Sequence, residues 1–312
     1  MVDSIPVISV IMPVYNSLRY LDAAVESILQ QSFQDFEFLI FDDGSSDGSR
    51  ERLQQYAAKD SRIQLFLREH GGLTLLLNEG LQKSSGQFIA RMDSDDIALK
   101  HRFEIQLNFL TQNPDCVAVG SEILRIDPGS LPIGIKGQPI THEEITHAFL
   151  NGKGGAIIHP SAMFPRAALE KIGGYDPELE PAEDFDLFIK LSEVGKLANL
   201  PQVLMKYRLH CKRTTDRKRV VQLEKVREIV HRAWLDRGLG EPPDDLLKTQ
   251  PILSPEQSRQ LWARTSMAQG YFLTGLKHAS ILLARKPYSF DRWKMVLRAS
   301  KHLSQHRSLA NL

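Results

Sequence analysis

The 312-residue sequence predicts an α/β protein with a mostly parallel sheet flanked by helices and with a helical C-terminal extension. Short apolar segments alternate with helical patterns between residues 7 and 119. These segments are nearly continuous in apolar residues, as expected of strands that are buried on both faces. Beyond residue 214 only helical patterns remain. We therefore expect a sheet domain over residues 1–213 and a helical extension over residues 214–312.

The first half of the chain contains five apolar segments that we interpret as strands. Helical stripes lie between them, the first over residues 21–29, the second over 53–57 and the third over 103–110. A turn-rich connection follows at residues 120–153, and residues 154–210 return to short strands and helices. The predicted strands cover residues 7–12, 36–41, 63–67, 86–92 and 116–120.

Composition and charge narrow the classes of function. A formal net charge of +1 provides no global field that would attract nucleic acid, so we expect small-molecule partners. Cys116 and Cys211 are the two cysteines, too few for a disulfide framework, which favours a reducing cytoplasm. The apolar N-terminal stretch contains two prolines and no basic leader, and is interpreted as a strand instead of a signal peptide. No segment approaches the ~20 apolar residues of a membrane span.

An acidic cluster, "DSDD", follows the fourth predicted strand. Its carboxylates are Asp93, Asp95 and Asp96, which repel one another unless a cation lies among them. A divalent cation with oxygen ligands would relieve that repulsion, and Mg²⁺ or Mn²⁺ would keep positions open for the oxygens of a departing diphosphate. An acidic turn that caps a helix beginning near Leu99 is the alternative.

A second acidic pair, Asp42 and Asp43, ends the second predicted strand in "FDDGSSDGS". A carboxylate at a strand end can accept from the N–H of a nucleotide base, and Asp42 is the candidate. The segment that begins at Asp43 and includes Asp47 also matches the first half of a calcium-binding EF-hand loop. Gln54 stands where the bidentate glutamate of such a loop belongs, which disfavours calcium.

Two further segments carry candidate side chains. Pro13 and Asn16 in "PVYN" either shape the opposite wall of a nucleotide site or form a turn and a helix start. Glu183 and Asp184 begin a helical pattern, where the helix dipole favours acids. One of them could equally take a proton from an attacking hydroxyl. For the glycines at 173–174 we favour the end of a helix that begins after Arg166.

Six motifs follow one another over roughly residues 5–212, namely "PVYN", "FDDGSSDGS", "NEGLQKSSGQFIARMDSDD", "HPSAMFPRAALEKIGGYDP", "AEDFDLFIKL" and "YRLH". In this order and at these intervals they resemble the family 2 glycosyltransferases. The resemblance implies a GT-A fold and transfer of a sugar from a nucleotide diphosphate, expected to be a UDP-sugar, with inversion at the anomeric carbon. Such a reaction needs one base and one electrophilic counter-charge, and no covalent nucleophile.

The same resemblance implies roles for individual residues. Asp184 is the expected general base, with Glu183 beside it. Asp95 is expected to bind the divalent cation, Mn²⁺ or Mg²⁺, and His210 to contact that cation or the diphosphate. The remaining contacts to the donor are expected from Pro13, Tyr15, Asn16, Asp42, Asp43, Asp93 and Arg208.

The acceptor and the setting are predicted more coarsely. Processive family members carry Gln-x-x-Arg-Trp, and here Ser289 replaces the glutamine before Arg292 and Trp293, so we expect one sugar per encounter. The expected acceptor is either a glycan or a lipid-linked acceptor. The expected location is the cytoplasm, at the inner face of the membrane. Basic residues near Trp293 and Leu297 could rest on the anionic surface of that membrane, or form a solvated helix face.

Parts of the sequence suggest three other functions. A non-catalytic module on the same fold would hold a nucleotide sugar or glycan without turnover. Phosphoryl transfer through an aspartate nucleophile is disfavoured because Ile97 stands where that scheme uses threonine or valine. A dinucleotide oxidoreductase is disfavoured because no G-x-G-x-x-G follows the first strand.

Overall fold

The computed structural model describes residues 5–210, 219–243, 246 and 253–309, with side chains up to 301. The chain forms two compact units. The first unit comprises Met1–Ile123, Gly137–Lys206 and Arg217–Thr249, and the second comprises Leu124–Lys136, Tyr207–Asp216 and Gln250–Leu312. The boundary predicted at residues 213 and 214 lies outside the described residues.

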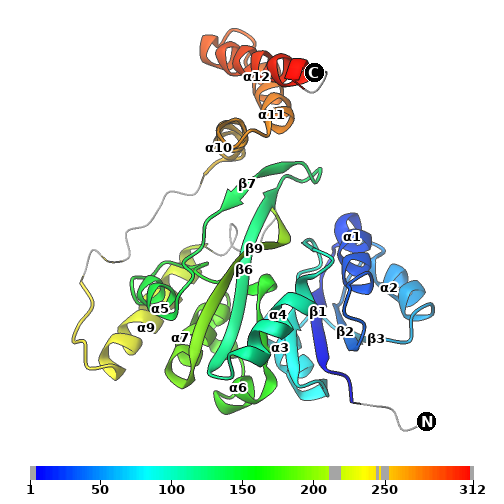
Figure 1. Ribbon diagram of the computed structural model, residues 1–312, viewed down its shortest axis with the longest axis vertical. Coiled ribbons are helices and arrows are strands. Elements are labelled where there is room, and N and C mark those ends of the chain that lie inside the picture. Colours follow the sequence, from blue (N-terminus) through cyan, green and yellow to red (C-terminus); the bar gives the residue numbers. More distant parts are fainter. Residues whose placement is uncertain (1–4, 211–218, 244–245, 247–252, 310–312) are drawn as a thin grey trace. The chain divides into compact units, whose positions relative to one another are not determined.

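Four parallel strands form the N-terminal half of the sheet (Figure 1). Their order is β3 (Ile63–Arg68), β2 (Phe36–Asp43), β1 (Ile8–Val14) and β4 (Phe88–Arg91). All residues of β1 and β2 are buried, as the continuous apolar segments predict. In the parallel register Ile8 lies opposite both Phe36 and Phe88, so the carboxyl ends of these strands meet at one edge.

Helices connect these strands. α1 (Leu18–Leu29) buries Leu21, Ala24, Val25 and Ile28, the stripe predicted from the sequence. α2 (Ser49–Ala57) and α4 (Arg102–Gln112) also lie where helical stripes were predicted. α3 (Leu73–Lys83) was not predicted; it packs on β1 and β2 through buried side chains that include Leu76 and Leu77.

Antiparallel strands extend the sheet beyond β4. β8 (Met163–Pro165) pairs with β4 and with β6 (Cys116–Ile126), and β5 (Ile97–Ala98) pairs with β9 (Lys196–Arg208). The connection predicted at residues 120–153 contains more structure than expected, namely the second half of β6, β7 (Pro132–Lys136) and α5 (His142–Leu150). Thr141 and Glu144 form a reciprocal cap at the start of α5.

A helical layer in the first unit surrounds α7 (Glu183–Val194). Figure 1 shows α7 beside α5 and α9 (Arg219–Asp236), and the aromatic ring of Phe149 on α5 packs against Phe185 and Phe188 on α7. Asp186 on α7 is fully buried and pairs with Arg232 on α9 and with Lys190. α6 (Arg166–Lys171) contacts both β8 and α7, while η1 (His159–Ser161) and η2 (Pro177–Leu179) complete this part.

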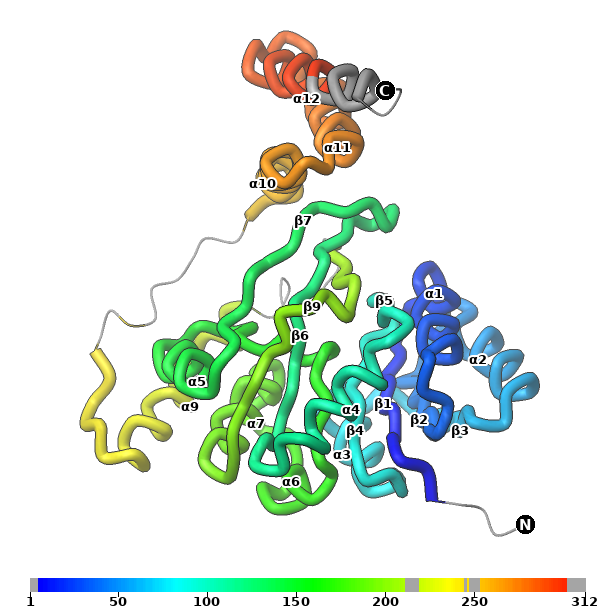
Figure 2. Tube along the Cα trace, viewed as in Figure 1, coloured from blue at the N-terminus to red at the C-terminus, as the bar shows by residue number. Residues whose placement is uncertain are grey.

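The second unit contains three consecutive helices and the β7 hairpin. α10 (Pro255–Ala268), α11 (Phe272–Arg285) and α12 (Phe290–Leu309) follow one another along the trace, and each packs on the next (Figure 2). Asp127 is fully buried and accepts from Lys277 Nζ at 2.6 Å, with His278 Nε2 at 2.9 Å. No helix among the described residues combines the length and the apolar character that crossing a bilayer requires.

Candidate active site

Hydrogen bonds join the loop after β1 to the loop after β2. Asn16 adopts a left-handed conformation with φ of 49°, which asparagine tolerates better than most residues. Its backbone N–H donates to Ser45 Oγ at 3.0 Å, and its Oδ1 accepts from the N–H of Ser46 at 2.9 Å. Pro13 is buried within β1 opposite Phe41, so it is a strand residue and not a turn residue.

Serine hydroxyls join the first loop to the acidic loop after β4. Ser17 Oγ lies 2.7 Å from the Oγ of Ser94, and Ser94 stands between Asp93 and Asp95 in the sequence. The loops after β1, β2 and β4 are thus connected to one another by hydrogen bonds at the edge of the sheet where these strands end.

Asp42 carries an unsatisfied oxygen at this edge. Its side chain is fully buried, and Oδ2 accepts from Arg50 Nε at 2.8 Å and from the N–H of Ser45 at 3.3 Å. Oδ1 has no hydrogen-bond partner. A buried carboxylate oxygen without a donor is costly, so this atom is suited to accept from an N–H that arrives with a ligand.

Asp43, in contrast, is engaged within the protein. Its carboxylate accepts from the N–H of Gly71 at 2.8 Å and lies 2.8 Å from His70 Nδ1. The ring of His70 stacks on Tyr15 with centroids 4.3 Å apart, and Tyr15 remains 49% exposed. Asp43 therefore orders the loop at residues 70–72, and its role as a direct donor contact stays a prediction. His70 was not singled out in the sequence because no motif includes it.

The calcium-loop alternative for residues 43–54 is wrong. Asp47 accepts from the N–H of Leu18 through Oδ2 at 3.0 Å and from Ser49 through Oδ1. Since Asp43 and Asp47 both accept from backbone N–H groups, their carboxylates close loops instead of surrounding an ion.

The acids of "DSDD" gather closely. One oxygen of each of Asp93, Asp95 and Asp96 lies within 4.8 Å of the others. The helix-cap alternative is wrong, because α4 begins at Arg102 and its cap residue is His101, which makes no capping side-chain bond. Three carboxylates in this arrangement provide an oxygen-only ligand set, which suits Mg²⁺ or Mn²⁺.

Two buried arginines lie among these acids, and sequence reasoning missed both. Arg91 is 3% exposed and forms an ion pair with Asp93. Burial alone would lower the pKa of the Arg91 guanidinium, but nearby groups, Asp93 first among them, raise it above its usual value. Arg102 is fully buried and donates to the carbonyl groups of Arg91 and Ala162. Burial lowers the pKa of Arg102, and Asp96 acts in the opposite direction. The two cations therefore offset part of the acidic charge before any ion binds.

Glu183 and Asp184 begin α7 with perturbed titration. Glu183 is 5% exposed, its Oε2 has no hydrogen-bond partner, and burial together with Asp184 raises its pKa to about 8. Asp184 is partly exposed and has a raised pKa, because desolvation and the charge of Asp93 outweigh the N–H of Phe185 and the charge of Arg91. The acid pair on α7 and the acidic loop after β4 thus act on each other electrostatically. Helix-dipole stabilisation alone does not account for a buried oxygen without a partner.

A buried hydrogen bond lies behind this pair. His159 Nε2 is 2.8 Å from the hydroxyl of Tyr175, and burial lowers the pKa of His159 well below its usual value. Burial also raises the pKa of Tyr175, whose hydroxyl lies in the field of Arg91, Glu183 and Asp184. Tyr175 was overlooked in the sequence, although it stands within "GGYDP".

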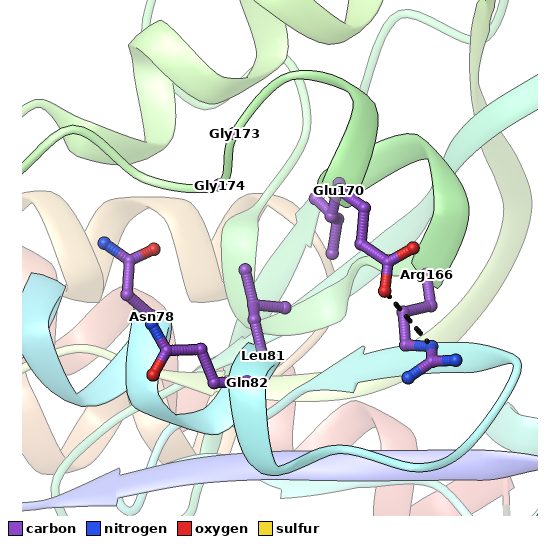
Figure 3. Close-up of a pocket in the computed structure, with 8 residues that line it drawn as sticks. Asn78, Leu81, Gln82, Arg166, Glu170, Gly173 and Gly174 are labelled. Atoms are coloured by element: carbon purple, nitrogen blue, oxygen red, sulfur yellow. Dashed lines mark ion pairs between the residues drawn. The ribbon is translucent and has the colours of Figure 1, made fainter.

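α3 positions Tyr175 through its backbone. Asn78 Oδ1 accepts from the N–H of Tyr175 at 2.9 Å, and Asn78 Nδ2 donates to its carbonyl at 2.8 Å. Gly173 and Gly174 end α6 with φ of 79° and 75°, so the predicted helix end is confirmed. A pocket of about 340 Å³ lies beside these glycines, and Figure 3 shows Asn78 across it from the ion pair of Arg166 and Glu170.

Arg208 and His210 belong to the second unit. Arg208 is 2% exposed, and its Nη1 donates to Ser130 Oγ at 2.9 Å and to the carbonyl of Asp127 at 3.2 Å. These contacts hold the turn before β7 and give no support to a diphosphate contact. The roles predicted for Arg208 and His210 stay predictions, while Cys211 lies outside the described residues.

Solved structures similar to this one define the class of fold. Residues 1–349 of S. aureus TarS, in complex with UDP, align with a TM-score of 0.54 and 18% identity over 96% of this chain and 91% of that one. The mannosyltransferase PcManGT of Pyrobaculum calidifontis, in complex with GDP-Man and Mn²⁺, aligns with a TM-score of 0.55 and 18% identity over 98% and 81%. The fold is that of the GT-A glycosyltransferases, as predicted.

Sequence comparison then gives the family. The model of glycosyl transferase family 2 matches residues 9–173, more than half of the chain, and the protein belongs to this family of glycosyltransferases. The O-antigen biosynthesis glycosyltransferase WbnJ of Escherichia coli is 34% identical over 66% of this chain and 81% of its own. The hyaluronan synthase of Pasteurella multocida is 27% identical over 76% of this chain and 24% of its own, so the chain spans about a quarter of that relative.

Proposed function

We propose that the protein is an inverting, metal-assisted glycosyltransferase that moves a sugar from a nucleotide diphosphate to an acceptor hydroxyl. The observation that carries this proposal is the grouping of the carboxylate oxygens of Asp93, Asp95 and Asp96 within 4.8 Å of one another, at the edge where the loops after β1, β2 and β4 are joined by hydrogen bonds. The charges of Asp93 and Arg91 both act on the pKa of Asp184, which supports a base close to this cluster. The family resemblance supplies the reaction type.

The nucleotide half of the donor is proposed to bind at the edge of β1 and β2. The unpartnered Oδ1 of Asp42 can accept from a base N–H, and the exposed ring of Tyr15 can cover a base face. Asn16 holds the adjoining loop, while Pro13 contributes to the wall from within β1. UDP, the nucleotide bound in the S. aureus TarS complex, is the proposed carrier.

Asp95, with Asp93 and Asp96, is proposed to hold the divalent cation. The carboxylate-only donor set fits Mn²⁺ or Mg²⁺, and the PcManGT complex contains Mn²⁺. When bound, the ion supplies positive charge that neutralises the departing diphosphate. Arg91 orients Asp93 through their ion pair, and Arg102 holds the backbone of Arg91.

Asp184 is proposed as the general base. In a coupled acid pair one proton is shared at neutral pH, and we assign it to Glu183 because that side chain is the more deeply buried. Asp184 then stays charged with a raised pKa, which brings its basicity nearer to the operating pH. The acceptor hydroxyl attacks the anomeric carbon from the face opposite the diphosphate. Its proton passes to Asp184 as the bond to the diphosphate breaks.

The acceptor is proposed to be a glycan or a lipid-linked sugar, with one sugar added per encounter. Ser289, in place of the glutamine of processive members, supports the single addition. The cytoplasm, at the inner face of the membrane, is the proposed location.

The test replaces Asp184 by asparagine. The variant is expected to bind a UDP-sugar as the parent does and to lose transfer, because the base acts only on the acceptor. Binding is measured as the rise in melting temperature with UDP-, GDP- and dTDP-sugars, with and without Mn²⁺. Equal loss of binding and transfer would argue against the base assignment. The non-catalytic module instead predicts donor binding without even slow Mn²⁺-dependent hydrolysis of the donor in the parent protein.

A further inference from the structure

The second unit exposes large apolar side chains at the start of α12. Tyr288 is 100% exposed, Phe290 72%, Leu297 63% and Trp293 48%. Residues 290, 293 and 297 follow helical spacing, so their side chains share one face of α12. Apolar side chains grouped in this way on a surface are typical of an interaction site, whereas single ones are ordinary.

The opposite face of α12 is fixed to its own unit. Ala299 is fully buried, and Arg292 is 9% exposed. Arg292 donates to the carbonyl of Leu282 on α11 and forms an ion pair with Glu256 on α10. The aromatic side chains therefore lie on the outward face of a helix whose inward face is already occupied.

Positive charge accompanies the apolar side chains. Lys294 and Arg298 are exposed on the same side of α12, and Lys294 Nζ lies 4.3 Å from the ring centroid of Phe290. Asp291 is the one acid in the sequence from 286 to 309. A protein whose net charge is only +1 thus concentrates cations where it exposes aromatic rings.

We propose that this aromatic–basic face, formed by Tyr288, Phe290, Trp293, Lys294, Leu297 and Arg298, binds the surface of a membrane that contains anionic lipids. Tryptophan and tyrosine prefer the depth of the lipid headgroups, where the ring is in an apolar region and its polar atom is near water. Lysine and arginine can extend from the same helix toward lipid phosphates. A helix that lies in the interface and does not span the bilayer needs only one apolar face.

The chemistry of this face favours lipid over nucleic acid. Nucleic acids are held mainly by charge contacts to phosphates, and an aliphatic side chain such as Leu297 adds nothing to such contacts. When the face binds a bilayer, Leu297 is removed from water, which favours binding. The apolar and the basic side chains of the face would therefore both contribute to membrane affinity. The inference does not depend on the sugar-transfer reaction and can fail separately from it.

The test uses the full chain with vesicles of phosphatidylcholine alone and of phosphatidylcholine mixed with phosphatidylglycerol. Binding is measured by flotation. The parent is expected to float with the anionic vesicles only. Lys294→Gln is expected to weaken that binding about fivefold and Lys294→Gln with Arg298→Gln about thirtyfold, since each cation near an anionic surface contributes a similar factor. Trp293→Ser is expected to weaken it as well.

Matched controls carry the same chemical changes elsewhere in the second unit. Arg264→Gln on α10 removes one exposed charge, and Leu273→Ser on α11 removes an apolar side chain that is 59% exposed. Neither control should change flotation. All five variants alter exposed positions, and unchanged melting temperatures would show that each is folded.

Tryptophan emission reports which side chain enters the lipid. The chain contains three tryptophans, and Trp293→Phe is expected to keep vesicle binding while removing the blue shift of emission. The proposal would be overturned by equal flotation with neutral vesicles, by the same losses in the controls, or by a blue shift that persists in Trp293→Phe. Binding to duplex DNA in place of anionic vesicles would overturn it in favour of nucleic acid.

Discussion

The parent protein should lose stability as pH rises, and replacing Glu183 by glutamine should remove part of that loss. The pKa of this buried carboxyl is about 8, raised from 4.5 by burial and by Asp184. A group whose pKa is higher in the folded state stabilises the fold fully below its unfolded pKa. That contribution is lost as pH rises from about 4.5 to about 8.

The magnitude follows from the shift. The difference of 8 − 4.5 = 3.5 units corresponds to about 5 kcal/mol at 1.36 kcal/mol per unit. Because Glu183 and Asp184 titrate as a pair, this free energy belongs to the two carboxyl groups together, and the change measured for Glu183 should be a few kcal/mol at most. Glutamine has nearly the same shape and carries no charge, so Glu183→Gln should remove this part of the pH dependence.

The assay is urea unfolding of both proteins in the absence of divalent cations, at a series of pH values between about 5 and 9. The free energy of unfolding of the parent should fall toward the alkaline end relative to the variant. Glu178→Gln, at an exposed position nearby, is the control and should follow the parent. Parallel curves for parent and Glu183→Gln over the whole range would refute the claim that a buried proton is held at residue 183.

Two further predictions concern the metal and the backbone. Asp95→Asn should abolish the additional rise in melting temperature that Mn²⁺ gives in the presence of UDP, because the cation loses a carboxylate ligand; a preserved Mn²⁺ effect would place the ion elsewhere. Gly174→Ala should destabilise the protein by about 1–3 kcal/mol, because φ is +75° and the new Cβ would lie 2.8 Å from Asn78 Oδ1. Gly173→Ala, at φ +79° with no atom within 4 Å, should cost only about 1 kcal/mol in thermal or urea unfolding; equal losses for the two would show that the contact with Asn78 has no effect.

The strands and their polar loops could be predicted from the sequence, since the signals are local. Continuous apolar segments identify β1 and β2, and each is followed directly by its polar loop. α3 was missed because "LTLLL" has no clear helical stripe: Leu75 is 54% exposed, while Leu76 and Leu77 are buried.

The positioning groups of the site could not be predicted, because their partners are distant in the chain. Asn78 holds Tyr175 from 97 residues away, and no spacing rule connects them. Arg91 resembles any basic residue at a strand end until the fold buries it beside Asp93. For Asp43 the residue type was correctly noted, but its engagement by the N–H of Gly71 depends on a turn that only the fold creates.

The hydrogen bonds that join the loops after β1, β2 and β4 have a kinetic consequence. Asn16, Ser17 and Asp47 hold these loops to one another without a ligand, so little backbone must be ordered when a donor arrives. Association with the nucleotide should then proceed without a slow rearrangement. Substitutions around this edge should change mainly how long the nucleotide stays bound, and much less how quickly it enters.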